Sequence, residues 1–127
     1  MRVAIDTNRL TDLFRGDRAL AEMLGGCDEV GLPLVVLGEM LAGFYGGTQR
    51  VTNEALLRAF LMKPTVRVLM PGRETAEQYG RLFVQMKRAG TPVPDNDLWI
   101  AAQVLEHELE LITRDAHFAK MPQVARV

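Results

Sequence analysis

The chain has 127 residues, with 15 Lys and Arg against 16 Asp and Glu, and its formal net charge of −1 excludes the general basic character typical of nucleic-acid-binding domains. Its contents of 48% hydrophobic and 24% charged residues are typical of a globular protein, and no apolar run approaches the roughly 20 residues of a membrane span. We predict a single domain over residues 1–127, with no membrane partner. One cysteine, Cys27, and no signal-peptide pattern favour a cytoplasmic location.

The chain begins with a short apolar run that leads directly into an acid. Val3, Ala4 and Ile5 predict a buried strand, because parallel strands covered on both faces are continuously apolar. Asp6 follows at the carboxyl end of this strand, and ligands bind at that edge in open α/β sheets.

Helical and strand-like segments then alternate up to residue 62. The expected elements are a helix over 9–15, a helix after Asp17 up to Leu24, a strand over 29–32, a helix in the later part of 34–45 and a helix over 49–62. The segment 34–45 is ambiguous between strand and helix. Glu39 lies in it, on a helical face shared with Val35, Val36, Ala42 and Gly43. An acid on such an apolar face needs a partner.

The second half contains the clearest helix of the chain. The expected elements are a strand over 66–70, a helix over 74–88 with an apolar stripe of Ala76, Tyr79, Leu82, Phe83 and Met86, a helix over 98–107, a strand over 109–113 and an edge strand over 124–127. This order predicts an α/β fold with a central, mostly parallel sheet and right-handed crossovers.

Four acids converge on one edge of the predicted sheet. Asp6 and Asp115 end strands, whereas Glu39 and Asp97 lie near the starts of helices. Converging carboxylates repel one another unless a cation lies between them, and oxygen ligands favour Mg²⁺ or Mn²⁺ over zinc.

Each acid also has an ordinary structural interpretation. Asp6 and Asp97 can be simple helix caps, Asp115 can be a turn residue, and Glu39 can be an ordinary surface residue, although its apolar face makes this the least comfortable of the four. His107 and His117 are expected to be solvated or structural. The joint placement of the acids, rather than any one of them, carries the prediction of a metal site.

Four motifs follow one another in the order and spacing of a known family. They are Ile5-Asp6-Thr7-Asn8, Gly38-Glu39-Met40-Leu41-Ala42-Gly43, Asn96-Asp97-Leu98-Trp99-Ile100-Ala101-Ala102 and Leu111-Ile112-Thr113-Arg114-Asp115-Ala116-His117-Phe118. Together they resemble the PIN-domain ribonucleases, and more narrowly the VapC toxins of prokaryotic toxin–antitoxin pairs. The likeness covers essentially the whole chain.

This resemblance implies a three-layer α/β/α fold, metal-dependent endoribonuclease activity, a homodimer and a cognate VapB-type antitoxin that blocks the site. It places Asp6, Glu39, Asp97 and Asp115 at the metal-binding acidic positions. Many members of the family carry Asn where Asp115 stands.

Specific roles follow as hypotheses. We expect Asp6 and Asp97 to be the principal Mg²⁺ ligands, with Glu39 and Asp115 positioning the metal or the attacking water. The supporting positions are Thr113, Asn8, Arg9 and Arg114. The two arginines are the first candidates for contacts with RNA phosphates.

Other protein classes fit less well. A receiver domain needs an acid at the end of its third strand, where this chain has Leu69-Met70-Pro71-Gly72, and a haloacid-dehalogenase-type phosphatase needs an acid at Asn8. A nuclease acting on DNA stays open. So does a non-catalytic protein of the same fold that binds RNA or a partner.

Overall fold

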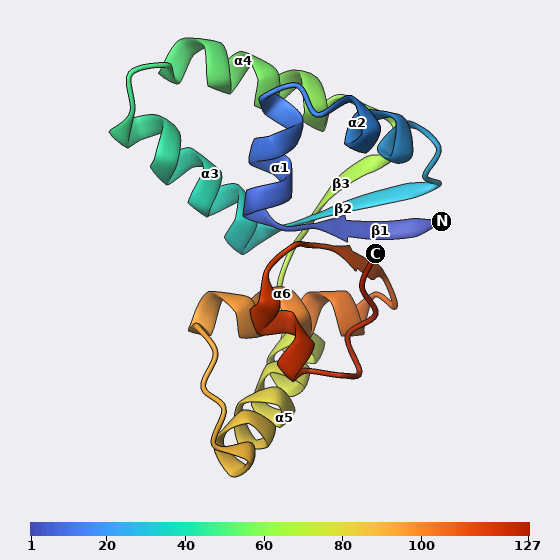
Figure 1. Ribbon diagram of the computed structural model, residues 1–127, viewed down its shortest axis with the longest axis vertical. Helices are drawn as coiled ribbons and strands as arrows, with labels where there is room; N and C mark the ends of the chain where they lie inside the picture. Colours follow the sequence, from blue (N-terminus) through green and yellow to red (C-terminus); the bar gives the residue numbers. More distant parts are fainter.

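A parallel sheet of four strands lies between two layers of helices in the computed structural model, which describes residues 1–127 (Figure 1). In chain order the elements are β1 (Arg2–Ile5), α1 (Thr7–Phe14), α2 (Arg18–Gly25), β2 (Glu29–Pro33), α3 (Leu34–Gly46), α4 (Arg50–Leu61), β3 (Val66–Leu69), α5 (Arg73–Ala89), α6 (Asp95–Glu106), β4 (Glu110–Ile112) and the 3₁₀ helix η1 (Ala116–Lys120). None of the helices has both the length and the hydropathy to cross a membrane.

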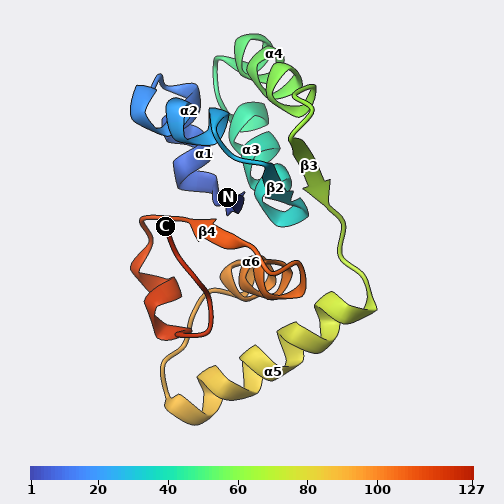
Figure 2. The same cartoon turned by 90° about the vertical axis from the view of Figure 1, so that its right-hand side faces the viewer.

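The strands lie in the order β3-β2-β1-β4, and all neighbours are parallel. Helices α1 to α4 cover one face of the sheet, whereas α5, α6 and η1 cover the other (Figure 2). This confirms the expected three-layer α/β/α fold. Because all strands are parallel, their carboxyl ends share one edge, and the segments after β1 and β4 start there side by side.

The ambiguous segment after β2 is helical from its first residue. Helix α3 begins at Leu34 directly after Pro33, and Val36, Met40 and Phe44 are buried. Packing of these side chains at a helical spacing overrides the strand-like run of valines. At the other end of the chain, the predicted edge strand over 124–127 is wrong in extent: it is reduced to one parallel bridge between Leu111 and Arg126.

The predicted apolar stripe of α5 is also partly wrong. Leu82 and Met86 are buried as expected, but Phe83 is 47% exposed and Ala76 is also exposed. The buried face instead begins at Thr75, which is fully buried because its hydroxyl accepts a hydrogen bond from the Gly72 N–H and donates one to Glu106. A pattern of apolar residues cannot predict the burial of a polar residue such as Thr75, whose hydroxyl both accepts and donates a hydrogen bond.

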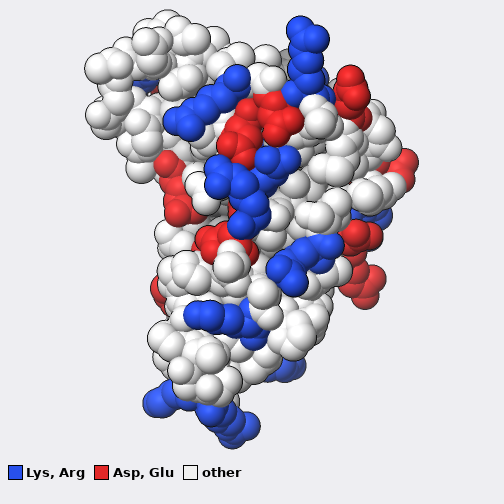
Figure 3. All heavy atoms as spheres, in the orientation of Figure 1, with Lys and Arg blue, Asp and Glu red and all other residues white.

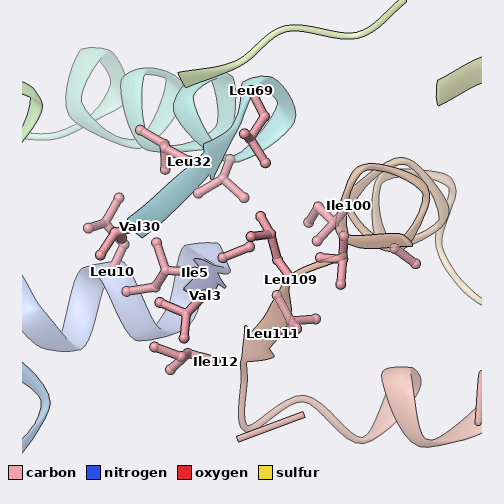
Figure 4. Close-up of a cluster of buried hydrophobic side chains, with 14 of the residues drawn as sticks. Val3, Ile5, Leu10, Val30, Leu32, Leu69, Ile100, Leu109, Leu111 and Ile112 are labelled. Carbon is pink, nitrogen blue, oxygen red and sulfur yellow. The ribbon is translucent and has the colours of Figure 1, made fainter. Parts of the chain in front are cut away.

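The core gathers on both faces of the sheet (Figure 4). Gly31 lies in the middle of β2, and the side chains of Leu69 and Leu109 fill the space that a Cβ atom would take. A Cβ at this position would lie 2.9 Å from Leu69 Cδ1 and 3.0 Å from Leu109 Cδ1. Both leucines are themselves buried, so neither has free space to move into.

We therefore expect Gly31→Ala to lower the free energy of unfolding by about 1–3 kcal/mol, because the added methyl group overpacks the sheet. Gly80→Ala is the matched control. Gly80 lies on the exposed face of α5 with no atom near its missing Cβ, so alanine there should raise stability by roughly 0.5–1 kcal/mol. Equilibrium unfolding in urea measures both, and equal midpoints for Gly31→Ala and the unchanged protein would contradict the packing argument.

Candidate active site

Asp6 occupies the point where β1 ends and α1 begins. Its carboxylate caps α1, because Oδ1 accepts a hydrogen bond of 3.0 Å from the Arg9 N–H, and Oδ2 accepts one from the Thr113 hydroxyl. Asp6 is therefore both the cap of α1 and a residue at the carboxyl edge of the sheet. Only 4% of Asp6 is exposed, and this burial raises the pKa of its carboxyl, which the bonds from Thr113 and Arg9 partly offset.

Glu39 projects from α3 toward the start of α1. The Thr7 hydroxyl donates a hydrogen bond of 2.7 Å to Glu39 Oε1, which supplies the partner that this acid needs. The expected inward face is partly wrong, since Val36 is buried but Ala42 and Gly43 are exposed. Glu39 lies half-buried at the sheet edge instead of inside the core.

Asp97 lies in the first turn of α6 and does not cap it. The N-cap position belongs to Pro94, and no side chain caps this helix. Burial raises the pKa of the Asp97 carboxyl, and the nearby Asp115 and Glu39 carboxylates raise it further, whereas a hydrogen bond from His117 lowers it. The simple-cap alternative for Asp97 is therefore wrong, and its carboxylate lies within electrostatic reach of two other acids.

Asp115 caps the short helix η1 just beyond β4. Its Oδ1 atom accepts a hydrogen bond of 2.9 Å from the His117 N–H, and its own N–H donates one of 3.0 Å to the Thr113 hydroxyl. The same hydroxyl donates to Asp6, so Thr113 joins the end of β4 to the end of β1. The structure thus brings Asp6, Asp97 and Asp115 together with Glu39 at one sheet edge. Whether they bind metal stays a prediction.

His117, which was expected to be solvated or structural, is partly exposed and lies in this cluster. Its Nδ1 atom lies 2.9 Å from Asp97 Oδ2 and 3.1 Å from Asp115 Oδ1. The signal in the sequence was its position two residues after Asp115, on the short turn that ends the last motif. His107, by contrast, lies at the far end of α6.

The two candidate arginines are paired with an acid that the sequence did not single out. Arg114 forms a two-pronged contact with Asp12, at 2.9 and 3.2 Å, and Arg9 Nη1 lies 2.9 Å from the same carboxylate. Arg114 and Arg9 lower the pKa of the Asp12 carboxyl. On the face seen in Figure 3, Lys and Arg side chains are interleaved with Asp and Glu side chains over the middle and form no single basic surface.

The remaining polar residues near the site have separate roles. Asn8 is exposed and its side chain forms no hydrogen bond. Asp95 accepts a hydrogen bond from the Tyr79 hydroxyl, and the Tyr79 ring stacks on Trp99 with centroids 4.0 Å apart. This stacking of Tyr79 on Trp99 joins α5 to α6 within the chain.

The donor set fits a hard divalent cation. No Lys or Arg forms an ion pair with any of the four acids, although the nearby charge of Arg114 partly offsets the raised pKa of Asp6. Three carboxylate oxygens, Asp97 Oδ1, Asp115 Oδ2 and Glu39 Oε2, accept no hydrogen bond. Partly buried carboxylates with free oxygens suit Mg²⁺ or Mn²⁺.

Known proteins are similar to this chain in sequence and in fold. A family model described as a PIN domain matches residues 3–124. Ribonuclease VapC1 of Haemophilus influenzae (strain R2866) is 28% identical over 116 residues, which cover 87% of this chain and 84% of that protein. A toxin–antitoxin complex from Klebsiella pneumoniae contains a chain that is 28% identical, with a TM-score of 0.74 and coverage of 97% of this chain and 95% of that one.

A third comparison concerns the fold alone. The structure of VapBC2 from Rickettsia felis, bound to a DNA fragment from their promoter, contains a chain with a TM-score of 0.89 at 20% identity. The match covers all of this chain and 98% of the other. The three-layer arrangement is therefore preserved at low sequence identity.

The raised pKa of Asp97 predicts a gain in stability when its charge is removed. A raised native-state pKa means that the ionised carboxylate destabilises the folded protein above the unfolded-state pKa, and that this cost disappears as the pH falls below it. We expect Asp97→Asn to raise the free energy of unfolding of the metal-free protein at neutral pH by roughly 1 kcal/mol.

Urea unfolding in the presence of a chelator measures this effect at about pH 7 and again near the ordinary Asp pKa of about 3.9, where the difference should shrink. Asp95→Asn, which removes an exposed charge two residues away, is the control and should not show the gain. A less stable Asp97→Asn protein at neutral pH would contradict the argument.

Proposed function

The chain belongs to the PIN-domain family, and we propose that it is a divalent-metal-dependent endoribonuclease that acts as the toxin of a type II toxin–antitoxin pair. The observation that carries this proposal is the convergence of four acids, none of which forms an ion pair with Lys or Arg. The similarity to ribonuclease VapC1 supports RNA as the substrate.

Each acid has a distinct part in the proposed site. Asp6 and Asp97, the two whose pKa values are raised by burial, hold the metal. Glu39 and Asp115 position the metal or the attacking water. Thr7 orients Glu39, and Thr113 orients Asp6 while it also accepts the Asp115 N–H. These hydrogen bonds fix the carboxylates before substrate arrives, which avoids reorganisation during the reaction.

When bound, a divalent ion supplies a water of lowered pKa and a positive charge that stabilises an in-line displacement at phosphorus. The chain contributes the four carboxylates that would hold the ion, and the almost complete burial of Asp6 keeps free water away from its carboxylate. Mg²⁺ and Mn²⁺ both suit the oxygen donors.

RNA would approach over a surface of mixed charge. Arg9 and Arg114 lie next to the acids and are the proposed phosphate contacts, although Asp12 holds both in the absence of RNA. The near-zero net charge supports weak non-specific binding, with selectivity from RNA shape and a few base contacts.

The proposed partner is a VapB-type antitoxin that covers the acidic site. The toxin–antitoxin complex from Klebsiella pneumoniae, whose similar chain matches along almost its whole length, supports this part of the proposal. We further propose that residues 1–127 form one domain, that two copies form a homodimer and that the protein acts in the cytoplasm.

The central prediction concerns RNA cleavage. Purified chain, free of antitoxin, should cut total cellular RNA at discrete positions with Mg²⁺ or Mn²⁺ and not with chelator. Asp97→Asn should reduce the cleavage rate by about 100-fold or more, because it removes one of the acids that hold the metal. Sequencing of the new RNA ends measures the cuts and names the substrate.

Asp95→Asn is the matched control for this experiment, since it makes the same chemical change two residues away, where the side chain contacts Tyr79 instead of the site. It should cleave at the unchanged rate. If folded, metal-loaded chain leaves host RNA intact, the non-catalytic RNA- or partner-binding function replaces the nuclease. Equal losses in both variants would exclude a special role for Asp97.

The proposed homodimer predicts a particle of about twice the 14.2 kDa mass of one chain. Exposed apolar residues such as Phe83 and Val84 on α5 supply surface that self-association would bury. Sedimentation equilibrium at micromolar concentration measures the mass. A single species of one-chain mass over the whole concentration range would show that the protein is a monomer.

A further inference from the structure

The imidazole ring of His117 lies beside Asp97 and Asp115, two of the four acids of the proposed metal site. Its Nδ1 atom is 2.9 Å from Asp97 Oδ2 and 3.1 Å from Asp115 Oδ1. One nitrogen and two oxygens from these three residues all lie within 4.8 Å of one another, which is close enough to share one ion.

The backbone that carries the ring is fixed at two points. The His117 N–H donates a hydrogen bond to Asp115 Oδ1, which ties the residue to the acid that begins η1. The next residue, Phe118, is 1% exposed and anchors η1 in the core. The fixed backbone therefore places Nδ1 beside the two acids, although the side chain is 41% exposed.

A nitrogen donor changes which ion a site prefers. Mg²⁺ binds almost only oxygen, whereas imidazole suits first-row transition ions, for which affinity rises from Mn²⁺ onward. We propose that His117 Nδ1 completes the metal site as a third ligand beside Asp97 and Asp115, and that the site therefore prefers Mn²⁺ to Mg²⁺. This inference rests on the proposed function for the presence of a metal, and adds a ligand and a preference to it.

The competing role for His117 is only to orient Asp97 through a hydrogen bond. His117→Asn separates the two roles, because the asparagine amide keeps a short N–H donor at the place of Nδ1 but offers no imidazole nitrogen. The chain also contains a natural control in its only other histidine. His107 lies ten residues after Asp97 along α6, about 15 Å away by the rise of a helix.

The test is electron spin-echo spectroscopy of the full chain loaded with Mn²⁺. A coordinated imidazole gives a nitrogen coupling that changes when the histidines carry ¹⁵N. We expect this coupling in the unchanged protein and in His107→Gln, and its loss in His117→Asn. Absence of the coupling from Mn²⁺-loaded unchanged protein, or its persistence in His117→Asn, would overturn the proposal.

Metal affinities provide a second measurement. Titration calorimetry should show Mn²⁺ binding weakened by about 10-fold or more in His117→Asn and Mg²⁺ binding changed by less than about 3-fold. Equal weakening for both ions would indicate the orienting role and overturn the nitrogen ligand. Neither measurement involves RNA, so a chain that shows the nitrogen coupling but cuts no RNA retains this site and loses only the nuclease function.

Discussion

The organising constraint of this structure is the placement of acidic side chains at the shared carboxyl edge of a parallel sheet. Strands β1 and β4 are neighbours and run in the same direction, so their following residues meet. The Thr113 hydroxyl connects the two by donating to Asp6 and accepting from the Asp115 N–H. Without this link, the buried Asp6 carboxylate would depend on the Arg9 N–H alone.

This arrangement makes the site costly to the metal-free fold. Asp6 and Asp97 both lose solvation on burial, each has the Asp115 carboxylate nearby, and neither forms an ion pair with Lys or Arg. Hydrogen bonds from hydroxyl and amide groups reduce the cost without cancelling the charge. A site that keeps its negative charge at the expense of stability is typical of function, since structural acids in a core are normally paired.

The sequence was informative where the physical signal is local. The apolar run before Asp6 and the glycine and proline boundaries predicted most elements of the fold and the sheet edge that carries the site. It was uninformative where a distant residue decides the outcome. Thr75 can be buried because its hydroxyl donates a hydrogen bond to Glu106. Asp12 belongs to the surroundings of the site because Arg114, which is distant in sequence, forms an ion pair with it. The contacts of His117 with Asp97 and Asp115 could not be predicted, because no periodicity reveals the neighbours of a histidine that follows a strand.

The pairing of Asp12 with Arg9 and Arg114 has a consequence for the thermodynamics of association. A free guanidinium that meets a phosphate releases a counterion from the nucleic acid, and this release makes affinity fall steeply with salt. Arg114 already pairs with Asp12, and Arg9 pairs with Asp12 and Asp17, so each guanidinium would exchange one anion for another. RNA binding through these two arginines is therefore expected to depend less steeply on ionic strength than two free arginines would. The shape of the RNA and its contacts with the metal site would then determine the affinity.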